Sequence, residues 1–148
     1  MNPTIMNHQA EAPLECGVFR AWILDDGKGT GGKSGVMEFS VVPHSTPPPP
    51  HVHRELVESF YLLAGEIELW WAGETRRAGA GTFVQIPAGL PHTYHNPGDD
   101  ELRFLAFFTP AEFVGFFREL ETLIKTGQAG PTTNTALLNK YHTDVVPR

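Results

Sequence analysis

The chain has 148 residues and a formal net charge of −6; 41% of its residues are hydrophobic and 19% are charged. This length suits one domain, because domains commonly contain about 100–200 residues. The 11 Lys and Arg residues are scattered, whereas binding to a phosphate backbone needs clustered basic side chains, and no window approaches the roughly 18 apolar residues that span a bilayer. We therefore expect neither a nucleic-acid partner nor a membrane partner.

The start of the chain and its cysteine content point to a cytoplasmic protein. The first twenty residues lack a basic stretch followed by an apolar run, which argues against a secretory signal. Cys16 is the only cysteine, so no internal disulfide can form and a reducing compartment fits. A redox or metal-binding role for Cys16 is the alternative to a structural one. We favour the structural role, because Cys16 lies far along the sequence from the other ligand-type residues.

The 15 Gly and 13 Pro residues favour many short strands joined by turns. Residues 1–13 form an arm to which the pattern assigns no structure. Apolar, β-prone runs then predict strands at residues 17–24 and 36–42.

The glycine-rich loop between these two strands contains the spacing of a phosphate-binding loop. Gly27, Gly32, Lys33 and Ser34 match G-x-x-x-x-G-K-[ST]. Such a loop works only where a helix begins at the Lys-Ser pair, so that the helix N-terminus faces the phosphate. A β-prone run follows here instead, so a flexible loop is the favoured interpretation.

Four consecutive prolines, residues 47–50, hold the chain extended and remove four backbone donors. They could form a ligand for a proline-recognising module or a stiff lead into the next strand. We favour the stiff lead.

Further strands are predicted at residues 58–63, 67–71, 82–86 and 102–108. Their turns fall at intervals of roughly ten residues, as in a sandwich or barrel. Several of these strands are apolar on both faces and need cover outside the barrel. A docked helix or a homodimer partner could provide it.

A helix is predicted at about residues 110–126. Thr109 is placed to cap it, Pro110 to open it and Glu112 to complete a capping box. Apolar residues at helical spacing form the face expected to pack on the barrel, and they are Phe113, Phe116, Phe117, Leu120 and Ile124. Gly127 is placed to end the helix. The tail, at about residues 128–148, has a weak Leu137, Leu138 and Tyr141 cluster and receives no assignment.

Four residues with metal-ligand side chains lie between these strands. His51 and His53 are separated by one residue in an extended segment, so both imidazoles point the same way. Glu58 opens the next strand, and His92 follows a Pro-Ala-Gly turn. Three neutral imidazoles and one carboxylate suit one divalent transition metal ion, and leave coordination positions for water or substrate. Fe, Ni, Mn, Cu and Zn are all compatible with this set.

Two segments around these residues resemble the two conserved motifs of the cupin superfamily. HVHRELVESFYLLAGE resembles the first motif, carried by His51, His53, Glu58 and Gly65. GTFVQIPAGLPHTYHN resembles the second motif, carried by Gly81, Pro87, Gly89, His92 and Asn96. The resemblance extends over roughly residues 36–109, about half the chain. One departure is Ser45, which stands where the first motif usually begins with glycine.

The resemblance implies a fold and a ligand set. The fold is all-β: a cupin double-stranded β-helix, or jelly-roll barrel, over about residues 17–109, with one C-terminal α-helix packed on it. We expect residues 1–148 to form one cupin domain. In this family the ligands of the metal are the residues matching His51, His53, Glu58 and His92. The alternative is a metal-free barrel in which these polar side chains form hydrogen bonds within the interior.

Other polar residues near the motifs are poorer candidates. Glu55 fits an exposed loop, His44 lies outside the motif, and His95 points away from His92 if its segment is extended. By the same alternation, Phe60 and Tyr94 share a face with ligands and could line a substrate pocket or belong to the core.

The sequence is similar to single-domain cupins of the quercetinase-like group. That similarity implies a metal-dependent dioxygenase acting on a flavonol-like or other small aromatic or enolic substrate, with Glu58 as both ligand and base. Two alternatives stay open: a non-enzymatic, metal-dependent binding or sensing protein, and a redox-neutral isomerase or decarboxylase.

Overall fold

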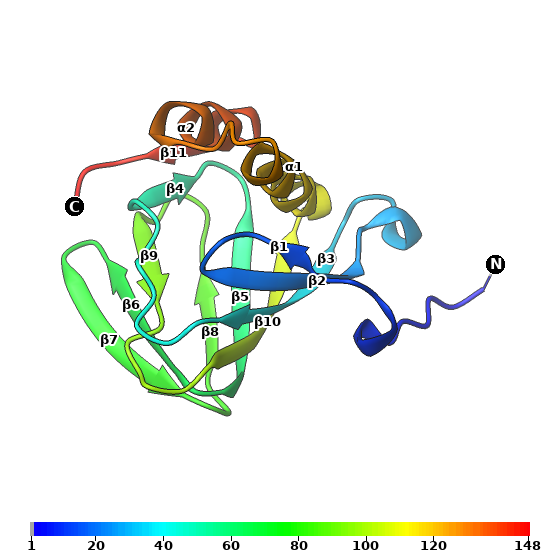
Figure 1. Cartoon of the computed structure of the whole chain (residues 1–148), viewed down its shortest axis with the longest axis horizontal. Helices are drawn as coiled ribbons and strands as arrows, with labels where there is room; N and C mark the ends of the chain where they lie inside the picture. Colours follow the sequence, from blue (N-terminus) through cyan, green and yellow to red (C-terminus); the bar gives the residue numbers. More distant parts are fainter. Residues whose placement is uncertain (1) are drawn as a thin grey trace.

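The computed structural model describes residues 2–148, which form two antiparallel sheets facing each other (Figure 1). The six-stranded sheet runs in the order β1 (Leu14–Glu15), β2 (Phe19–Asp25), β3 (Gly35–Val41), β10 (Leu102–Thr109), β5 (Val57–Ala64) and β8 (Phe83–Ile86). The five-stranded sheet runs β11 (Thr143–Val145), β4 (His51–His53), β9 (His92–His95), β6 (Glu66–Trp71) and β7 (Glu74–Gly79). The predicted all-β cupin fold is confirmed.

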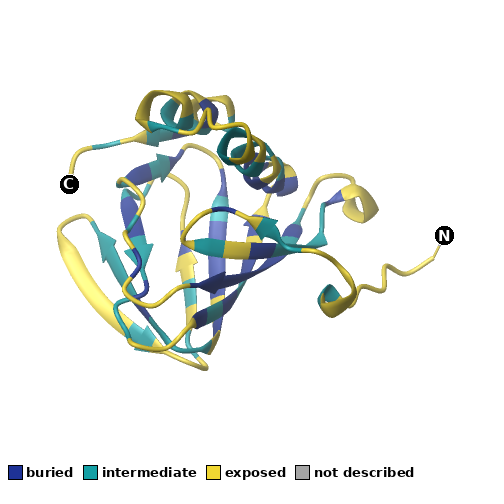
Figure 2. Cartoon of the chain, viewed as in Figure 1, coloured by how far each residue is buried: buried dark blue, intermediate teal, exposed yellow. Residues whose placement is uncertain are grey.

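The core lies between the sheets, and along β10 buried residues alternate with more exposed ones (Figure 2). On β10 the inward residues are Leu102, Phe104, Ala106 and Phe108, all without exposed surface. Phe104 stacks on Phe39 of β3, with ring centroids 5.1 Å apart. Burial of these aromatic rings supplies much of the hydrophobic free energy that holds the sheets together.

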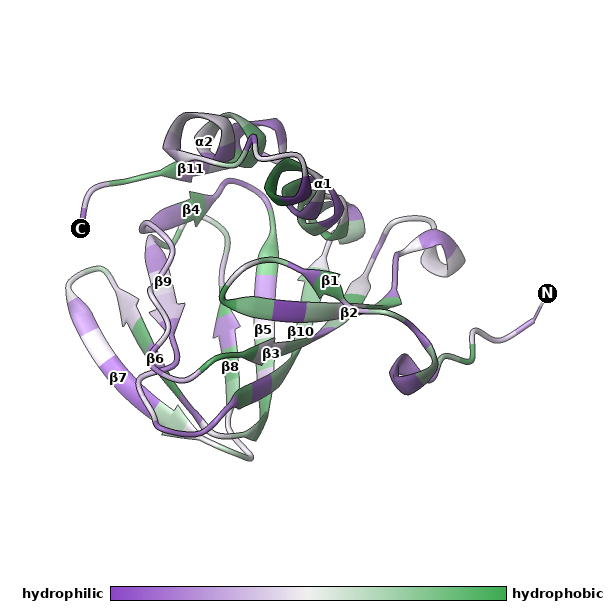
Figure 3. Ribbon diagram, viewed as in Figure 1, coloured by the Kyte–Doolittle hydropathy of each residue, from purple (hydrophilic) through white to green (hydrophobic). Residues whose placement is uncertain are grey.

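The six predicted strands are all present, with ends shifted by one or two residues. The sequence pattern missed β7, because Glu74–Gly79 is mostly hydrophilic and exposed (Figure 3). It pairs with β6 through a tight turn at Ala72 and Gly73, both with positive φ.

The glycine-rich loop holds only the short 3₁₀ helix η2 (Lys28–Thr30), and β3 begins at Gly35. No helix N-terminus therefore stands at the Lys-Ser pair.

The predicted helix consists of the 3₁₀ turn η3 (Ala111–Phe113) followed by α1 (Val114–Lys125). Its apolar residues pack on the core as predicted, with Phe113, Phe116 and Phe117 buried. The predicted capping box was wrong: Thr109 is the last residue of β10, and no side chain caps η3 or α1. At the other end, Gly127 ends α1 in a Schellman motif, because its N–H bonds the Ile124 carbonyl and the next N–H bonds Leu123.

The unassigned tail forms a second helix, α2 (Pro131–Lys140), and the strand β11. Both helices lie over one end of the barrel, beside β4 (Figure 1). Near the N-terminus, η1 (His8–Ala10) rests against β2 through the His8 and Trp22 rings. No helix formed by residues 2–148 is long and apolar enough to cross a membrane.

Candidate metal centre

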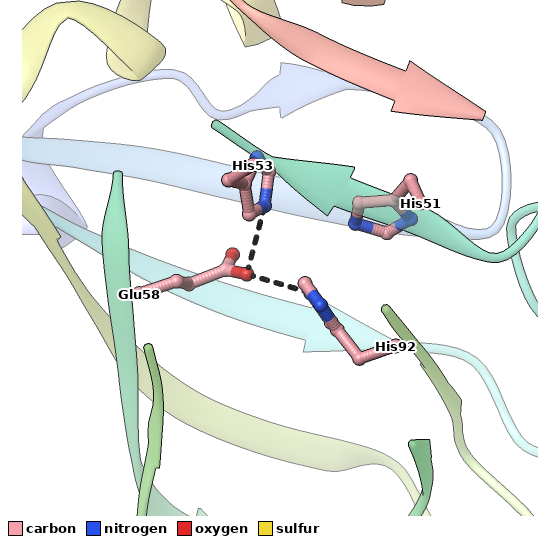
Figure 4. Close-up of side chains that lie close together, drawn as sticks. All are labelled: His51, His53, Glu58 and His92. Atoms are coloured by element: carbon pink, nitrogen blue, oxygen red, sulfur yellow. Dashed lines mark hydrogen bonds and ion pairs between the residues drawn. The ribbon is translucent and has the colours of Figure 1, made fainter. Parts of the chain in front are cut away.

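Four buried side chains from three strands converge inside the barrel (Figure 4). His51 and His53 project from β4 to the same side, and His51 lies directly opposite His92 of β9 in the sheet register. Glu58 reaches them from β5 of the facing sheet. One potential ligand atom from each residue lies within 4.8 Å of all the others. The structure thus brings together all four residues that the sequence singled out.

Each imidazole is oriented by an acceptor at its outer nitrogen. His51 Nδ1 lies 2.9 Å from the Pro49 carbonyl oxygen, and His92 Nδ1 lies 2.9 Å from that of Leu90. His53 Nδ1 lies 2.8 Å from the Thr143 hydroxyl. That hydroxyl donates to the Tyr141 carbonyl, so it must accept a hydrogen bond from His53. Every Nδ1 therefore carries its proton, which leaves Nε2 of each neutral ring as an acceptor.

This arrangement fits a bound cation. The Nε2 atoms of His53 and His92 each lie 3.3 Å from the Glu58 Oε2 atom. A neutral imidazole would thus direct a lone pair at a carboxylate, and two acceptors repel unless a positive charge lies between them. A proton or a metal ion satisfies that requirement. The donor set, three imidazoles and one carboxylate, is that of a divalent first-row metal site.

The ionisation states of two of the four residues favour metal binding. Burial, together with the neighbouring imidazoles, lowers the pKa of His51 to about 4. Burial would raise the pKa of Glu58, but hydrogen bonds from His53 and His92 outweigh it and hold that pKa well below its usual range. Burial would lower the pKa of His92, yet hydrogen bonding and attraction to Glu58 raise it above its usual value. His51 and Glu58 are therefore in their ligand forms at neutral pH, and His92 must lose a proton to bind metal.

A cavity of about 160 Å³ opens beside His51 and Glu58. Its walls are mostly apolar and come from β2, the proline segment, β9 and both C-terminal helices; they include Phe19, Pro48, Pro49, Tyr94, Phe113, Phe116, Phe117, Leu120, Asn134 and Leu138. Phe60, also considered for this pocket, has no exposed surface and lies against the Tyr94 ring, 5.0 Å away. A larger hollow of about 400 Å³ lies under the N-terminal arm, lined by residues such as Trp22 and Arg118, and it contains none of the four candidate ligands.

Tyr94 lines the cavity and has a phenol group that can donate a hydrogen bond. Burial, and to a smaller extent the Glu58 charge, holds the pKa of Tyr94 far above its ordinary value. The phenol therefore remains protonated at any physiological pH.

The other polar residues considered from the sequence lie away from this centre. Glu55 is exposed. His44 is exposed and pairs with Asp99 at 2.7 Å, and His95 lies 3.8 Å from Glu68 of β6. Burial, with a smaller contribution from Glu121, raises the pKa of the Cys16 thiol to about 12, so that thiol is not a nucleophile at neutral pH.

The departure from the first motif at Ser45 has a local structural role. Ser45 is buried, its N–H donates to the Asn96 carbonyl, and its hydroxyl accepts from the Asn96 N–H. The Asn96 side chain in turn donates to the carbonyls of Val41 and Asp100. Ser45 and Asn96 thus fasten the two motif segments together.

Sequence reasoning missed Thr143 and the residues of α2 that line the cavity. Thr143 is fully buried because β11 pairs with β4, with Thr143 opposite His53. A three-residue strand at the end of a polar tail has no hydrophobic pattern that could have indicated it.

Comparison with known proteins agrees with this architecture. Residues 37–108 match the family model of the cupin domain, Cupin_2. Over 70 residues the chain is 30% identical to quercetin 2,3-dioxygenase from Bacillus subtilis (strain 168), a match that covers 47% of this chain and 20% of that protein. Over 80 residues it is 29% identical to polyketide synthase CurC from Streptomyces cyaneus, covering 54% of this chain and 52% of that protein. The chain thus spans about a fifth and about half of these two relatives.

The fold is shared with the polyketide cyclase RemF from Streptomyces resistomycificus. The TM-score is 0.63 at 23% identity, with 73% of this chain and 80% of that chain covered. This likeness concerns the fold alone. The family match and the paired sheets together identify a cupin domain in this chain at residues 37–108, and these residues contain all four candidate ligands.

Proposed function

We propose that this protein is a mononuclear metal-dependent dioxygenase acting on a small aromatic or enolic, flavonol-like substrate. The observation that carries the proposal is the buried cluster of three histidines and Glu58 opening onto an apolar cavity. The local similarity to quercetin 2,3-dioxygenase supports it. His51, His53, Glu58 and His92 would hold Fe, Ni, Mn, Cu or Zn, and the metal would act as Lewis acid for a substrate oxygen and make dioxygen chemistry accessible.

Glu58 has a second role in this proposal. Its Oε2 atom lies 3.3 Å from the Nε2 atoms of His53 and His92, and the residue also lines the cavity. A substrate hydroxyl beside the metal site would thus meet a base within reach. Tyr94 would donate a hydrogen bond to a substrate oxygen, and the ring of Phe113 would pack against a flat substrate.

Oxygen uptake tests this proposal. The purified protein would first be loaded separately with Fe²⁺, Ni²⁺, Mn²⁺ and Cu²⁺, and metal content checked by elemental mass spectrometry. Flavonols, catechols and small enolic acids would then be offered in an oxygen electrode. Consumption of one dioxygen per substrate consumed, with both oxygen atoms recovered in the product, supports the proposal. No uptake with any compound in fully loaded protein contradicts it.

A redox-neutral reaction is the second candidate, because both the CurC relative and the RemF structure carry polyketide-related names. Here the metal would polarise a carbonyl while Glu58 moves a proton, as an isomerisation, decarboxylation or cyclisation requires. Product formation under nitrogen by zinc-loaded protein would favour it over the dioxygenase.

A third candidate is a non-enzymatic binding or sensing protein, which predicts that ligands raise the melting temperature without any turnover.

The partners proposed for this chain are a small-molecule substrate and a second copy of itself. The outer face of the six-stranded sheet presents large apolar side chains, including Phe83 at 59% exposure opposite Tyr61 at 41%. Contiguous exposed apolar residues mark interaction surfaces, and a two-fold dimer would cover the face with itself. Light scattering should give the dimer mass, and Phe83→Glu with Tyr61→Glu should give the monomer; a monomeric parent protein would contradict the homodimer.

The proposed compartment is the cytoplasm, on the ground of the single buried thiol of Cys16. Fractionation of the native host would test it.

A further inference from the structure

The cavity at the metal centre adjoins a second cavity. The inner one, of about 160 Å³, contains His51 and Glu58, and the outer one has a volume of about 270 Å³. Residues that line both cavities lie at the boundary between them, here called the neck, and they are Phe19, Pro48, Pro49, Tyr94, Leu120 and Asn134. The two cavities therefore meet at the neck and are called the inner and the outer chamber.

The inner chamber has the size and chemistry of an aromatic-ring site. Beyond its two candidate ligands its walls include Phe113 and Phe116 from the C-terminal helices, and Leu138 of α2. An apolar cavity of about 150 Å³ accommodates benzene. Common ligand pockets measure roughly 300–1,000 Å³, so the inner chamber alone holds about one ring.

The outer chamber is larger and of mixed character. Val18 and Ile124 contribute apolar surface, whereas Ser45, Thr46 and His95 contribute polar groups. It carries no candidate metal ligand, so its role would be to hold a part of the ligand that does not react.

We infer that the neck connects the two chambers and that the substrate is a two-part molecule, with one oxygen-bearing ring in the inner chamber and a second ring, or an apolar group of similar size, in the outer chamber. The inference rests on the proposed function in one respect: the oxygens of the first ring are taken to reach the metal. The neck fixes the distance between the two parts. Because Leu120, Asn134 and Ile124 come from the C-terminal helices, these helices determine which second group is accepted.

Two probes with the same metal-binding end test the inference. Catechol fills the inner chamber only, whereas 4-phenylcatechol adds a second ring. Each would be titrated into Co²⁺-loaded full-length protein, and binding followed by the visible absorption of the metal, so that no turnover is needed. Burial of an additional ring predicts at least about tenfold tighter binding of 4-phenylcatechol.

Variants of α1 locate the second ring. Ile124→Trp should fill the outer chamber, abolish the advantage of 4-phenylcatechol and leave catechol binding within twofold of the parent protein. Thr122→Trp is the matched control, because it places the same side chain on an exposed face of the same helix, away from both chambers. Leu138→Trp should weaken both probes, because Leu138 lines the inner chamber. Cobalt content of each variant would be measured alongside.

Equal affinity for the two probes in the parent protein overturns the inference, as does an Ile124→Trp variant that weakens both equally. Absence of binding by either probe overturns it as well. The dioxygenase proposal fails separately: probes that bind as expected but support no oxygen uptake leave the two-chamber inference standing. Oxygen uptake by a protein that binds the two probes equally would support the dioxygenase proposal and overturn the two-chamber inference.

Discussion

Thr143 should control metal affinity although it touches no metal ligand atom. Its hydroxyl lies 2.8 Å from His53 Nδ1 and donates to the Tyr141 carbonyl, 3.1 Å away. Thr143→Val keeps the shape of the side chain and removes the hydroxyl, which is the acceptor for His53 and the donor to the Tyr141 carbonyl. The imidazole then loses both its fixed orientation and the group that keeps its Nε2 atom free to coordinate.

The magnitude follows from these contacts. Loss of an outer hydrogen-bond partner of a metal-bound histidine typically costs about 10–100-fold in metal affinity, or roughly 1.4–2.7 kcal/mol. Thr143→Val also leaves the His53 Nδ1 proton and the Tyr141 carbonyl without partners in a buried site, which costs about 1–3 kcal/mol of stability for each group left unsatisfied. We therefore expect a folded protein with a lower melting temperature and a weaker metal site.

Competition between the protein and a chelator for Zn²⁺ or Co²⁺ measures the first effect, and thermal unfolding of metal-free protein measures the second. Thr143→Ser is the matched control, because it keeps the hydroxyl and loses only a methyl group. Its metal affinity should stay within about threefold of the parent value, well inside the range expected for losing the hydrogen bond. If Thr143→Val folds and binds metal as tightly as the parent protein, the hydroxyl does not orient His53 and the reasoning fails.

Four other changes test the remaining features of the structure. His92→Ala should release the metal and keep the β-rich circular dichroism spectrum, since the core is apolar; unfolding of this variant would make the metal structural. Metal affinity should fall as the pH drops through the pKa of His92, which attraction to Glu58 raises above its ordinary value, because protons compete for the same nitrogen; a constant dissociation constant between pH 5 and 8 would contradict this. Glu58→Gln should retain some metal but lose turnover, since an amide accepts no proton at neutral pH; activity at the parent level would remove Glu58 as the base. Gly65→Ala should destabilise by about 2–5 kcal/mol, because its φ is +76° and a Cβ would lie 2.5 Å from the Glu101 carbonyl oxygen. Gly73→Ala, with φ +90° and open space around it, should cost only about 1–2 kcal/mol, and equal unfolding energies would refute the steric argument.

The parts of the fold that the sequence predicted are those with local, periodic patterns. The strand at residues 102–108 is a short run of mostly apolar residues, and the Phe residues of α1 recur at helical spacing. The His-x-His segment likewise needs only strand alternation to bring two imidazoles to one side. That Glu58 and His92 join them could be expected only from the family motifs, because these two residues lie on other strands and local patterns do not predict how strands are arranged.

The parts that escaped prediction depend on tertiary contacts. Glu74–Gly79 is a strand only because it pairs with β6, and its own residues are hydrophilic. The capping pattern at Thr109 was overridden because β10 continues to that residue and pairs it with Val57. Thr143 lies opposite His53 because of the register between two three-residue strands. The sequences of such short strands do not specify their register.

These two classes of residue divide the site into a metal-binding part and a substrate-binding part. All four candidate ligands fall within residues 37–108, the region that matches the cupin family model. By contrast, Phe113, Phe116, Leu120, Asn134 and Leu138, which close the inner chamber, all come after it. Relatives matched through the shared region therefore inform the metal chemistry, whereas a C-terminal segment outside that match supplies much of the cavity proposed to admit the substrate. It follows that exchanging the segment after residue 108 between two cupins should change ligand selectivity while leaving metal affinity nearly constant, apart from the contribution of the residue at position 143.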